Sequence, residues 1–343
     1  MRKLRVAQYG FCHEHAAGKM LTLRRFCQDE IELAGIVDDR ASRTLRFVND
    51  HAAEAFAGVP VITEDALFAR GNVDVVLVET TNDDLVPTAR KCVAHGLPLH
   101  LDKPGCQDAG AFRDLVEQCR ARRIPLQMGY MFRVNPAIQF AIRAVREGWL
   151  GDVFRLEADM DHCYGNPAYD AYLASLRGGI MYNLGCHLID FIVAMLGKPD
   201  RVASVLKPLT GHRPDATLNA MAILEYAHGF AEIRACSSRR VAASGRRLLI
   251  CGSKGTIELC PIERFDKGAL ELSLSLAEPA GGYGAGLHTV AFTPVRDRYE
   301  EQFRQLFRLV RGETAPDASL YDHDLAVHEV VLAASGIGTG GLR

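Results

Sequence analysis

Residues 4–132 alternate between short apolar segments and segments with helical periodicity. The apolar segments predict strands at 4–10, 32–39, 59–63, 73–80, 97–104 and 125–132. The segments between them predict helices at 14–28, 42–56, 83–96 and 108–123. Apolar runs that are continuous rather than alternating are typical of a parallel sheet with helices on both faces. Repeated strand–helix units of this kind predict a doubly wound, nucleotide-binding α/β fold.

A different pattern begins after Phe132. Helices are predicted at 135–151 and 178–197, a strand at 152–161, and two closing helices from Tyr299 and from Asp322. The intervening strand-like segments are separated by short loops that contain Gly or Pro, and they lie at 201–209, 217–227, 229–238, 246–252, 255–261, 269–277 and 288–293. Strands so closely spaced predict a mostly antiparallel sheet, and hence an α+β second domain.

The length and composition restrict the class of protein. A chain of 343 residues is long for one domain. We expect a dinucleotide-binding domain at 1–132 and a domain for substrate binding and oligomerisation at 133–343, with the final helices packing back on the first domain as an option. The formal net charge is −2, without the basic excess of a nucleic-acid-binding protein. The ten cysteines never form Cys-x-x-Cys, which argues against a zinc finger or a disulfide framework.

The location is predicted from the absence of two signals. No apolar run reaches the ~20 residues of a membrane helix, and the apolar stretch behind the basic N-terminus is too short for a signal peptide. We therefore expect a cytoplasmic protein with a small-molecule substrate and with neither a nucleic-acid nor a membrane partner.

The segment GFCHEH at 10–15 follows the first predicted strand and permits two interpretations. One is a metal site, because His-x-His at a strand end binds a divalent metal in amidohydrolase-type barrels. That fold needs eight strand–helix units, whereas the second half of this chain is a run of strands. A zinc site also needs further ligands at a plausible spacing, and no motif unites the candidates Asp161, His162, Cys163, Cys186 and His187. We predict no bound metal.

The other interpretation is a dinucleotide-binding loop. In G-x-G-x-x-G the glycines close the turn and let the pyrophosphate approach the helix N-terminus. Gly10 is in place here, whereas Cys12 and His15 occupy the other two glycine positions. We expect Gly10, Phe11, Cys12, His13 and His15 to contact the cofactor, with a hydrogen bond from His13 or His15 to the pyrophosphate.

Asp38 lies at the carboxyl end of the second predicted strand, at a suitable distance from Gly10. A carboxylate at this place accepts hydrogen bonds from both ribose hydroxyls and repels a 2′-phosphate. We therefore expect NAD in preference to NADP. Arg40 and Arg43 lie close by and complicate this preference, because an arginine there accommodates a 2′-phosphate.

Four further segments carry a resemblance to a known family. "LPLHLDKPG" at 97–105 resembles the Glu-Lys-Pro signature of the glucose–fructose oxidoreductase, inositol dehydrogenase and rhizopine-catabolism (Gfo/Idh/MocA) family, with Asp102 in place of Glu. "ETTND" at 79–83 resembles the family's Thr-Pro-Asn turn, with Thr81 in place of Pro. "QMGYMFRVNPAIQ" at 127–139 is similar to the entry to its second domain, and "GGIMYNLGCHLID" at 178–190 to its Gly-Gly-x-x-x-Asp-x-Gly-x-His-x-x-Asp segment.

The resemblance implies a Rossmann domain, a domain with an open-faced sheet, a bound nicotinamide dinucleotide, and a sugar or polyol oxidised or reduced between the domains. It also implies a homodimer or homotetramer formed through the C-terminal sheet. Carried over residue by residue, Lys103 takes the position of the family's catalytic lysine and His187 that of its catalytic histidine. Asn183 stands where the family has an aspartate. The turn and signature residues are expected to contact the cofactor: Thr80, Thr81, Asn82, Asp102 and Lys103.

The residue types suggest a division of roles. Hydride leaves a carbon as its hydroxyl loses a proton, so a base is required, and His187 is the expected base because histidine titrates near neutral pH. Lys103 is expected to polarise the reacting oxygen, and Asn183 to orient a substrate hydroxyl or the imidazole. Further candidates for substrate binding, besides Lys103, Asn183 and His187, are Tyr130, Arg133, His162, Tyr164 and Arg177.

Three other functions remain open at this point. The first is a redox-neutral lyase or glycosidase that retains NAD and forms a transient keto intermediate. The second is a non-catalytic ligand sensor, and the third a metal-dependent hydrolase.

Overall fold

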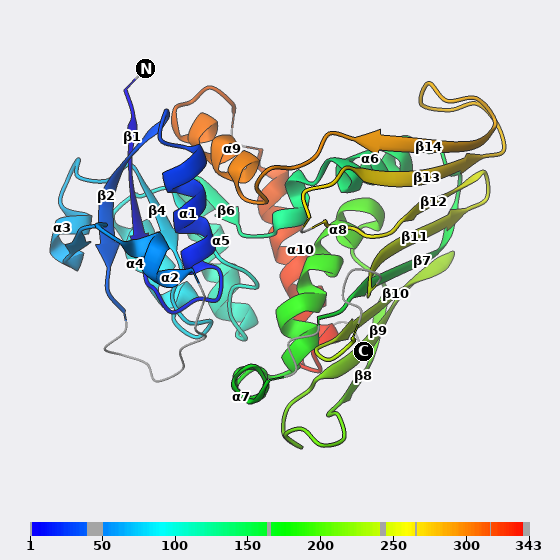
Figure 1. Ribbon diagram of the computed structural model, residues 1–343, viewed down its shortest axis with the longest axis horizontal. Helices are drawn as coiled ribbons and strands as arrows, with labels where there is room; N and C mark the ends of the chain where they lie inside the picture. Colours follow the sequence, from blue (N-terminus) through cyan, green and yellow to red (C-terminus); the bar gives the residue numbers. More distant parts are fainter. Residues whose placement is uncertain are drawn as a thin grey trace. The chain divides into compact units, whose positions relative to one another are not determined.

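The computed structural model describes residues 2–39, 51–162, 166–240, 245–264, 266–315 and 317–338. The chain forms two compact units (Figure 1). The first contains 1–130 and 297–325, and the second contains 131–296 and 326–343. Among the described residues, no helix has both the length and the apolar character needed to cross a membrane.

The first unit contains a six-stranded parallel sheet, in the order β3-β2-β1-β4-β5-β6. Its strands are β1 Leu4–Tyr9, β2 Ile31–Val37, β3 Val61–Ile62, β4 Val75–Val78, β5 Leu99–Leu101 and β6 Leu126–Met128. Its helices include α1 Ala16–Phe26, α2 Ala52–Phe56, α3 Glu64–Phe68, α4 Leu85–Ala94 and α5 Ala109–Arg122. All four residues of β4 are fully buried, as expected for a central strand covered on both faces. The predicted doubly wound sheet is confirmed.

A helix from the end of the chain packs on this unit. Helix α9, Glu300–Val310, follows Asp297, whose carboxylate accepts a hydrogen bond from Thr22 Oγ1 of α1 at 3.0 Å. Gln302 donates from Nε2 to the carbonyl oxygen of Met128 at 2.9 Å, and Arg304 of α9 forms an ion pair with Glu30. The last helix, α10 Ser319–Ala334, spans the boundary at residue 325 between the two units.

The second unit contains an eight-stranded sheet, in the order β14-β13-β12-β11-β7-β10-β9-β8 (Figure 1). Its strands are β7 Val153–Met160, β8 Arg201–Lys207, β9 Asn219–Tyr226, β10 Gly229–Cys236, β11 Arg246–Gly252, β12 Gly255–Leu259, β13 Leu270–Leu276 and β14 Gly286–Phe292. Strands β7 and β10 pair in parallel, and the other neighbours pair antiparallel. Buried and exposed residues alternate along β13, so one face of the sheet is packed and the other is open.

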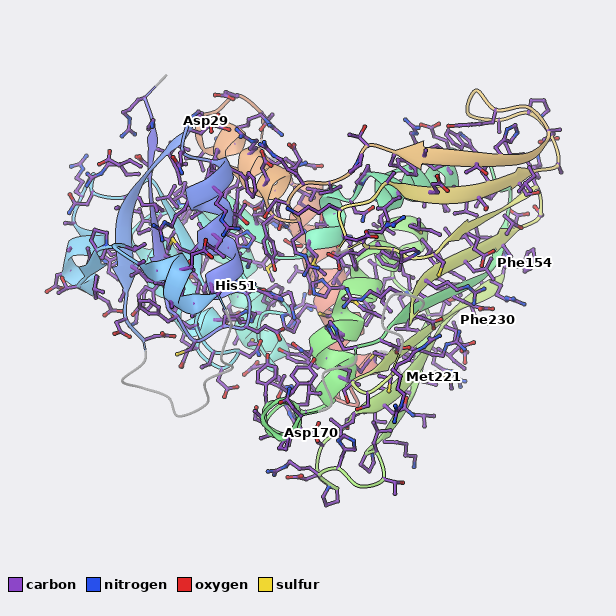
Figure 2. The ribbon with its side chains drawn as sticks, in the orientation of Figure 1. Asp29, His51, Phe154, Asp170, Met221 and Phe230 are labelled. Carbon is purple, nitrogen blue, oxygen red and sulfur yellow. The ribbon has the colours of Figure 1, made fainter. Side chains whose placement is uncertain are left out.

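Helices α6 Pro136–Arg146 and α8 Cys186–Leu196 pack in this unit, which also contains α7 Pro167–Ala174. The open face of the sheet carries charged side chains that pair across strands: Arg234 Nε lies 2.6 Å from Asp159 Oδ1, and Arg247 Nη1 lies 3.4 Å from Glu157 Oε2. Phe154 and Phe230, labelled in Figure 2, are 49% and 42% exposed.

Several elements differ from the predictions. The helix predicted at 178–197 is a π-helical segment, Met181–Gly185, followed by α8. The sixth strand ends at Met128, and a 3-10 helix follows at Met131–Val134. Helices α3 and α7 were not predicted. Of the helix predicted at 42–56, only the part from His51 onward, which includes α2, lies within the described residues.

A double-glycine turn precedes the π-helical segment. Gly179 has φ +45°, and a Cβ there would lie 2.2 Å from the carbonyl oxygen of Thr217. Both the left-handed backbone and the close approach therefore require glycine. Gly211 has φ +83°, but a Cβ there would meet no atom within 4 Å.

We expect Gly179→Ala to destabilise the protein by about 3 kcal/mol or more, since backbone strain adds to a steric clash. Gly211→Ala introduces the left-handed backbone strain without a steric clash and should lower the free energy of unfolding by about 1 kcal/mol. Thermal melting of both variants measures this difference. Equal Tm values for the two variants would show that the chain near Thr217 relaxes without cost.

Candidate active site

The loops that follow β1, β2, β4, β5 and β6 lie at one edge of the first unit's sheet. In a parallel sheet the carboxyl ends of the strands share one edge, and ligands bind there beside the point where the strand order reverses. This edge contains the predicted cofactor residues of the unit, at 10–15, 38, 80–82 and 102–103. The sheet topology therefore brings together segments that are far apart in sequence.

Gly10 makes the turn after β1. Its φ is +104°, and a Cβ there would lie 2.7 Å from the carbonyl oxygen of Glu79 and 2.9 Å from Asp39 Oδ2. The His13 N–H donates to the same Glu79 carbonyl at 2.9 Å, and α1 begins at Ala16. A tight glycine turn that leads into a helix N-terminus fits the pyrophosphate of a dinucleotide, although two of the three fingerprint glycines are absent.

The carboxylate beside this turn belongs to Asp39. Its Oδ1 accepts the Phe11 N–H at 2.8 Å, whereas the adjacent Asp38 is exposed. Burial raises the pKa of Asp39, and hydrogen bonds from the Phe11 N–H and the Cys12 thiol oppose that rise. The ribose-binding role of Asp38 stays a prediction, and Asp39 is a second candidate, because two adjacent acids at a strand end cannot be distinguished by pattern alone. Arg40 and Arg43 lie outside the described residues.

The loop after β4 turns directly into α4. The carbonyl oxygen of Thr81 accepts the N–H groups of Asp84 and Leu85, at 2.9 and 3.1 Å. Thr80 and Asn82 are buried, and Thr81 is partly exposed. A role of Thr80, Thr81 and Asn82 in cofactor binding stays a prediction.

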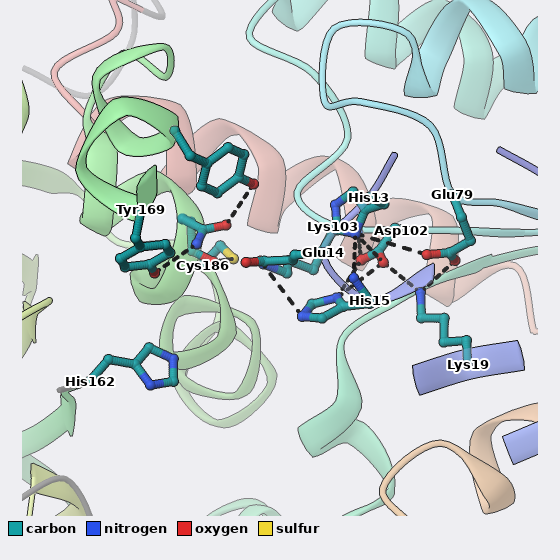
Figure 3. A network of polar contacts seen from close by, with 12 residues as sticks. His13, Glu14, His15, Lys19, Glu79, Asp102, Lys103, His162, Tyr169 and Cys186 are labelled. Carbon is teal, nitrogen blue, oxygen red and sulfur yellow. Dashed lines mark hydrogen bonds and ion pairs between the residues drawn. The ribbon is translucent and has the colours of Figure 1, made fainter. Parts of the chain in front are cut away.

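Asp102, at the end of β5, is the centre of a buried charge cluster (Figure 3). Its Oδ2 lies 2.8 Å from His13 Nδ1, 2.7 Å from Lys19 Nζ and 3.1 Å from His15 Nδ1. Lys19 Nζ also donates to Glu79 Oε1 at 2.7 Å. Burial opposes ionisation of Asp102, but His13 and Lys19 hold its pKa well below the usual range. Burial and the neighbouring Asp102 raise the pKa of Glu79 well above its usual range, against the effect of Lys19.

Lys103 follows Asp102 and is fully buried. Its backbone N–H donates to Asp102 Oδ1 at 2.6 Å, and its Nζ donates to Glu14 Oε1 at 3.0 Å. The peptide bond to Pro104 is cis. Two carboxylates therefore hold the predicted catalytic lysine. Asp102 binds its backbone N–H, and Glu14, from the loop after β1, binds its side-chain amine.

His187 and Asn183 lie in the second unit. His187 is in the first turn of α8, is 1% exposed, and packs edge-to-face against Phe132 with ring centroids 5.8 Å apart. Asn183 lies in the π-helical segment, where its Nδ2 donates to the Tyr169 hydroxyl at 3.2 Å and its Oδ1 accepts from the Tyr172 hydroxyl at 3.3 Å (Figure 3). Two tyrosines therefore fix the orientation of the Asn183 amide.

Arg133, a predicted substrate residue, makes a paired contact with the buried Asp190. The Arg133 Nη2 and Nε atoms lie 2.6 and 3.0 Å from Asp190 Oδ1. Such a two-nitrogen contact orients the guanidinium, and so the Asp190 carboxylate sets its direction.

His162 lies just after β7, and its Nδ1 is 3.0 Å from Nη2 of the buried Arg246. Arg246 also donates to Glu263 Oε2 at 2.6 Å. Sequence reasoning missed Arg246, because an arginine within a strand pattern reads as a surface residue. The contacts of the buried Arg246 with His162 and Glu263 cannot be recognised from the spacing of these residues in the sequence.

The remaining substrate candidates are dispersed. Tyr130 is buried, directly after β6 in the first unit. Arg177 is exposed and precedes the double-glycine turn of the second unit. Tyr164 lies outside the described residues.

Two family models match the chain. The model described as an oxidoreductase family with an NAD-binding Rossmann fold matches residues 9–130, and the GFO/IDH/MocA C-terminal domain matches residues 138–258. The chain belongs to the Gfo/Idh/MocA family. The predicted family, fold, oxidoreductase class and NAD cofactor are thereby confirmed.

Individual relatives are distant. The chain is 23% identical over 256 residues to trans-1,2-dihydrobenzene-1,2-diol dehydrogenase of Sus scrofa, with 72% of each chain covered. It is 24% identical over 294 residues to inositol 2-dehydrogenase of Rhizobium meliloti, covering 81% of this chain and 86% of that one. An oxidoreductase from Agrobacterium radiobacter, solved in complex with NAD+, L-tartaric acid and magnesium, has a TM-score of 0.76 at 20% identity, covering 99% of this chain and 97% of that one.

Three side chains of this family member bring potential metal-ligand atoms close to one another. One potential ligand atom from each of His13, His15 and Asp102 lies within 4.8 Å of the others. The Lys19 ammonium, however, already lies 2.7 Å from Asp102 Oδ2. A divalent cation bound there would be repelled by that charge, and so we retain the prediction that no metal is bound.

Prolonged dialysis against EDTA should leave turnover unchanged, because the Lys19 ammonium neutralises Asp102 without a metal. Metal analysis of the purified protein by mass spectrometry provides a measure that does not depend on turnover. A stoichiometric metal, or turnover that is lost with EDTA and returns with zinc or manganese, would contradict this prediction.

The position of Asp39 leads to a second prediction for this family member. Asp39→Asn should weaken NAD binding by roughly 10-fold or more, because a hydrogen bond to a charged group contributes about 1.5–3 kcal/mol. The matched variant Asp38→Asn should change the Kd by less than about 3-fold. Calorimetric titration of both variants decides between the two acids, and a larger loss in Asp38→Asn would support the assignment made from sequence.

Proposed function

We propose that the chain is an NAD-dependent dehydrogenase or reductase whose substrate is a sugar, a polyol or a derivative of one. The observation that carries the proposal is the buried Lys103, whose Nζ is held 3.0 Å from Glu14 Oε1 at the ligand edge of a Rossmann sheet. Membership of the Gfo/Idh/MocA family supports the reaction class. The named relatives, an inositol dehydrogenase and a dihydrodiol dehydrogenase, support a substrate with hydroxyls on a six-membered ring.

The reaction requires two transfers that balance. The nicotinamide dinucleotide, held at the carboxyl edge of the Rossmann sheet, would supply the acceptor for the hydride of the carbinol carbon. The hydroxyl oxygen would lose its proton to a base, so that a carbonyl group forms. Lys103 donates a hydrogen bond to the reacting oxygen, on which negative charge develops. His187 takes the proton, as a group whose ordinary pKa lies near 6.5.

The remaining assignments follow from the chemistry of each group. The loop from Gly10 to His15 holds the pyrophosphate, and Asp39 holds the adenosine ribose and favours NAD over NADP. Asn183, oriented by Tyr169 and Tyr172, presents an amide to a substrate hydroxyl. The guanidinium of Arg133, the His162–Arg246 pair, Tyr130 and Arg177 remain candidates for further substrate contacts.

The open face of the sheet in the second unit is also the surface through which we propose that the chain oligomerises. The paired charges of the open sheet face, together with the exposed Phe230 on the same side of β10 as Arg234, are features of a surface that a second copy of the chain would cover. We propose a homodimer or homotetramer formed through this face, in the cytoplasm. The partner of the site is a small molecule rather than a nucleic acid or a membrane.

Lys103→Ala tests the catalytic assignment. We expect kcat to fall on the order of 10²-fold or more, since a positioned group that acts on the reacting oxygen is lost. The NAD Kd should stay within about 3-fold. The control is Lys91→Ala, which removes an exposed lysine of the same unit.

The measurement is NADH formation with a panel of sugars and polyols, combined with mass spectrometry of small molecules released from denatured protein. Activity of Lys103→Ala within a few-fold of wild type would exclude the catalytic role. NAD that co-purifies, with product formed but no net NADH, would replace the dehydrogenase by the redox-neutral enzyme.

A further inference from the structure

Glu14 stands in the loop after β1 and contacts the catalytic lysine. Its Oε1 lies 3.0 Å from Lys103 Nζ and 3.6 Å from His15 Nε2. The Glu14 side chain is 10% exposed and the Lys103 side chain is fully buried. An ion pair with so little solvent access is screened weakly by water and salt, so loss of one partner is costly for the other.

We propose that Glu14 is the positioning residue of Lys103: its carboxylate holds the side chain in place and keeps the amine in the charged form that donates hydrogen bonds. The effect of Glu14 on catalysis rests on the proposed function, whereas its effect on the charge of Lys103 rests only on the contact between the two side chains. Glu14 acts through Lys103 and needs no contact with the substrate.

Glu14 is suited to this role because it stays ionised. Burial alone would raise its pKa, but Lys103, His15 and His13 outweigh burial and lower the pKa to about 2. The carboxylate therefore carries its charge at any pH at which the enzyme would work. A carboxylate with so low a pKa, and already paired with the Lys103 amine, is only a weak base.

Other charged or titratable groups of the first unit lie near this pair and have contacts of their own. Burial, with a further contribution from Lys103, lowers the pKa of His15 to about 4 against the effect of Asp102, and so the imidazole is neutral. The Asp102 carboxylate accepts the Lys103 backbone N–H and contacts His13 and Lys19. Glu79 pairs with Lys19 in turn.

The consequence for the reaction is a fixed division of labour. A lysine held as an ammonium stabilises the developing charge on the reacting oxygen but cannot accept a proton. Proton removal then falls to a different group, in agreement with the role proposed for His187.

The test measures the titration of Lys103 without substrate or cofactor. Protein labelled with [ε-13C]lysine gives one NMR signal per lysine, and the Lys103 signal is identified by its loss in Lys103→Met. In Glu14→Gln we expect the titration midpoint of Lys103 to fall by about one pH unit or more, because removal of an opposite charge at this distance disfavours the ammonium. Glu14→Asp keeps the charge at a greater distance and should give a smaller fall.

The matched control is Glu278→Gln, which removes a carboxylate from an exposed lysine pair, Lys254–Glu278 at 2.7 Å, and should leave the Lys103 midpoint unchanged. If Glu14→Gln melts at a lower temperature, the Glu14→Asp titration carries the test. An unchanged midpoint in both Glu14 variants would overturn the proposal.

The kinetic arm separates this proposal from the proposed function. In Glu14→Gln the alkaline limb of kcat/KM should move to lower pH by the same interval as the NMR midpoint, since the active ammonium is lost sooner as pH rises. A shifted NMR midpoint in a protein that turns over no sugar or polyol would confirm the pairing and contradict the dehydrogenase function. A shifted midpoint with an unshifted alkaline limb would overturn the catalytic consequence.

Discussion

The buried carboxylate of Asp102 is the interaction on which the candidate site of the first unit depends. It joins the end of β5 to the loop after β1 through His13, and to the body of α1 through Lys19. Removal of one partner from a buried pair costs about 3–5 kcal/mol, so these contacts hold the loop and the strand end in one arrangement. Lys103 inherits its position from this arrangement, because its own backbone N–H is bound to the same carboxylate.

The charge cluster explains how the loop functions with one fingerprint glycine. Glycines at the other two positions would leave room for the backbone to approach a pyrophosphate. Here the side chains of His13 and His15 turn toward Asp102, and that of Glu14 toward Lys103. The side chains of the loop therefore bind Asp102 and Lys103 at the end of β5, while Gly10 still makes the tight turn against the Glu79 carbonyl.

The sequence was sufficient to predict the fold class and the strand-end positions of Asp102 and Lys103, because local periodicity and turn residues report burial within a single segment. It did not predict the contacts of Lys19 with Asp102 or of Glu14 with Lys103, whose members lie 83 and 89 positions apart. Lys19 reads as a solvated residue on a helix and is fully buried. The choice between Asp38 and Asp39 depended on the direction of two side chains, which no pattern specifies.

The distribution of carboxylates relates position 183 to the loop after β1. At position 183, where the family's segment has an aspartate, this chain has an asparagine whose amide is held by Tyr169 and Tyr172. An asparagine cannot stabilise an imidazolium by charge, so His187 lacks that reason to remain protonated. In the loop after β1, at a position that the fingerprint leaves open, the chain has Glu14 beside Lys103. Both residues act in the same direction, because Asn183 favours a histidine free to accept a proton and Glu14 favours a lysine that keeps its own.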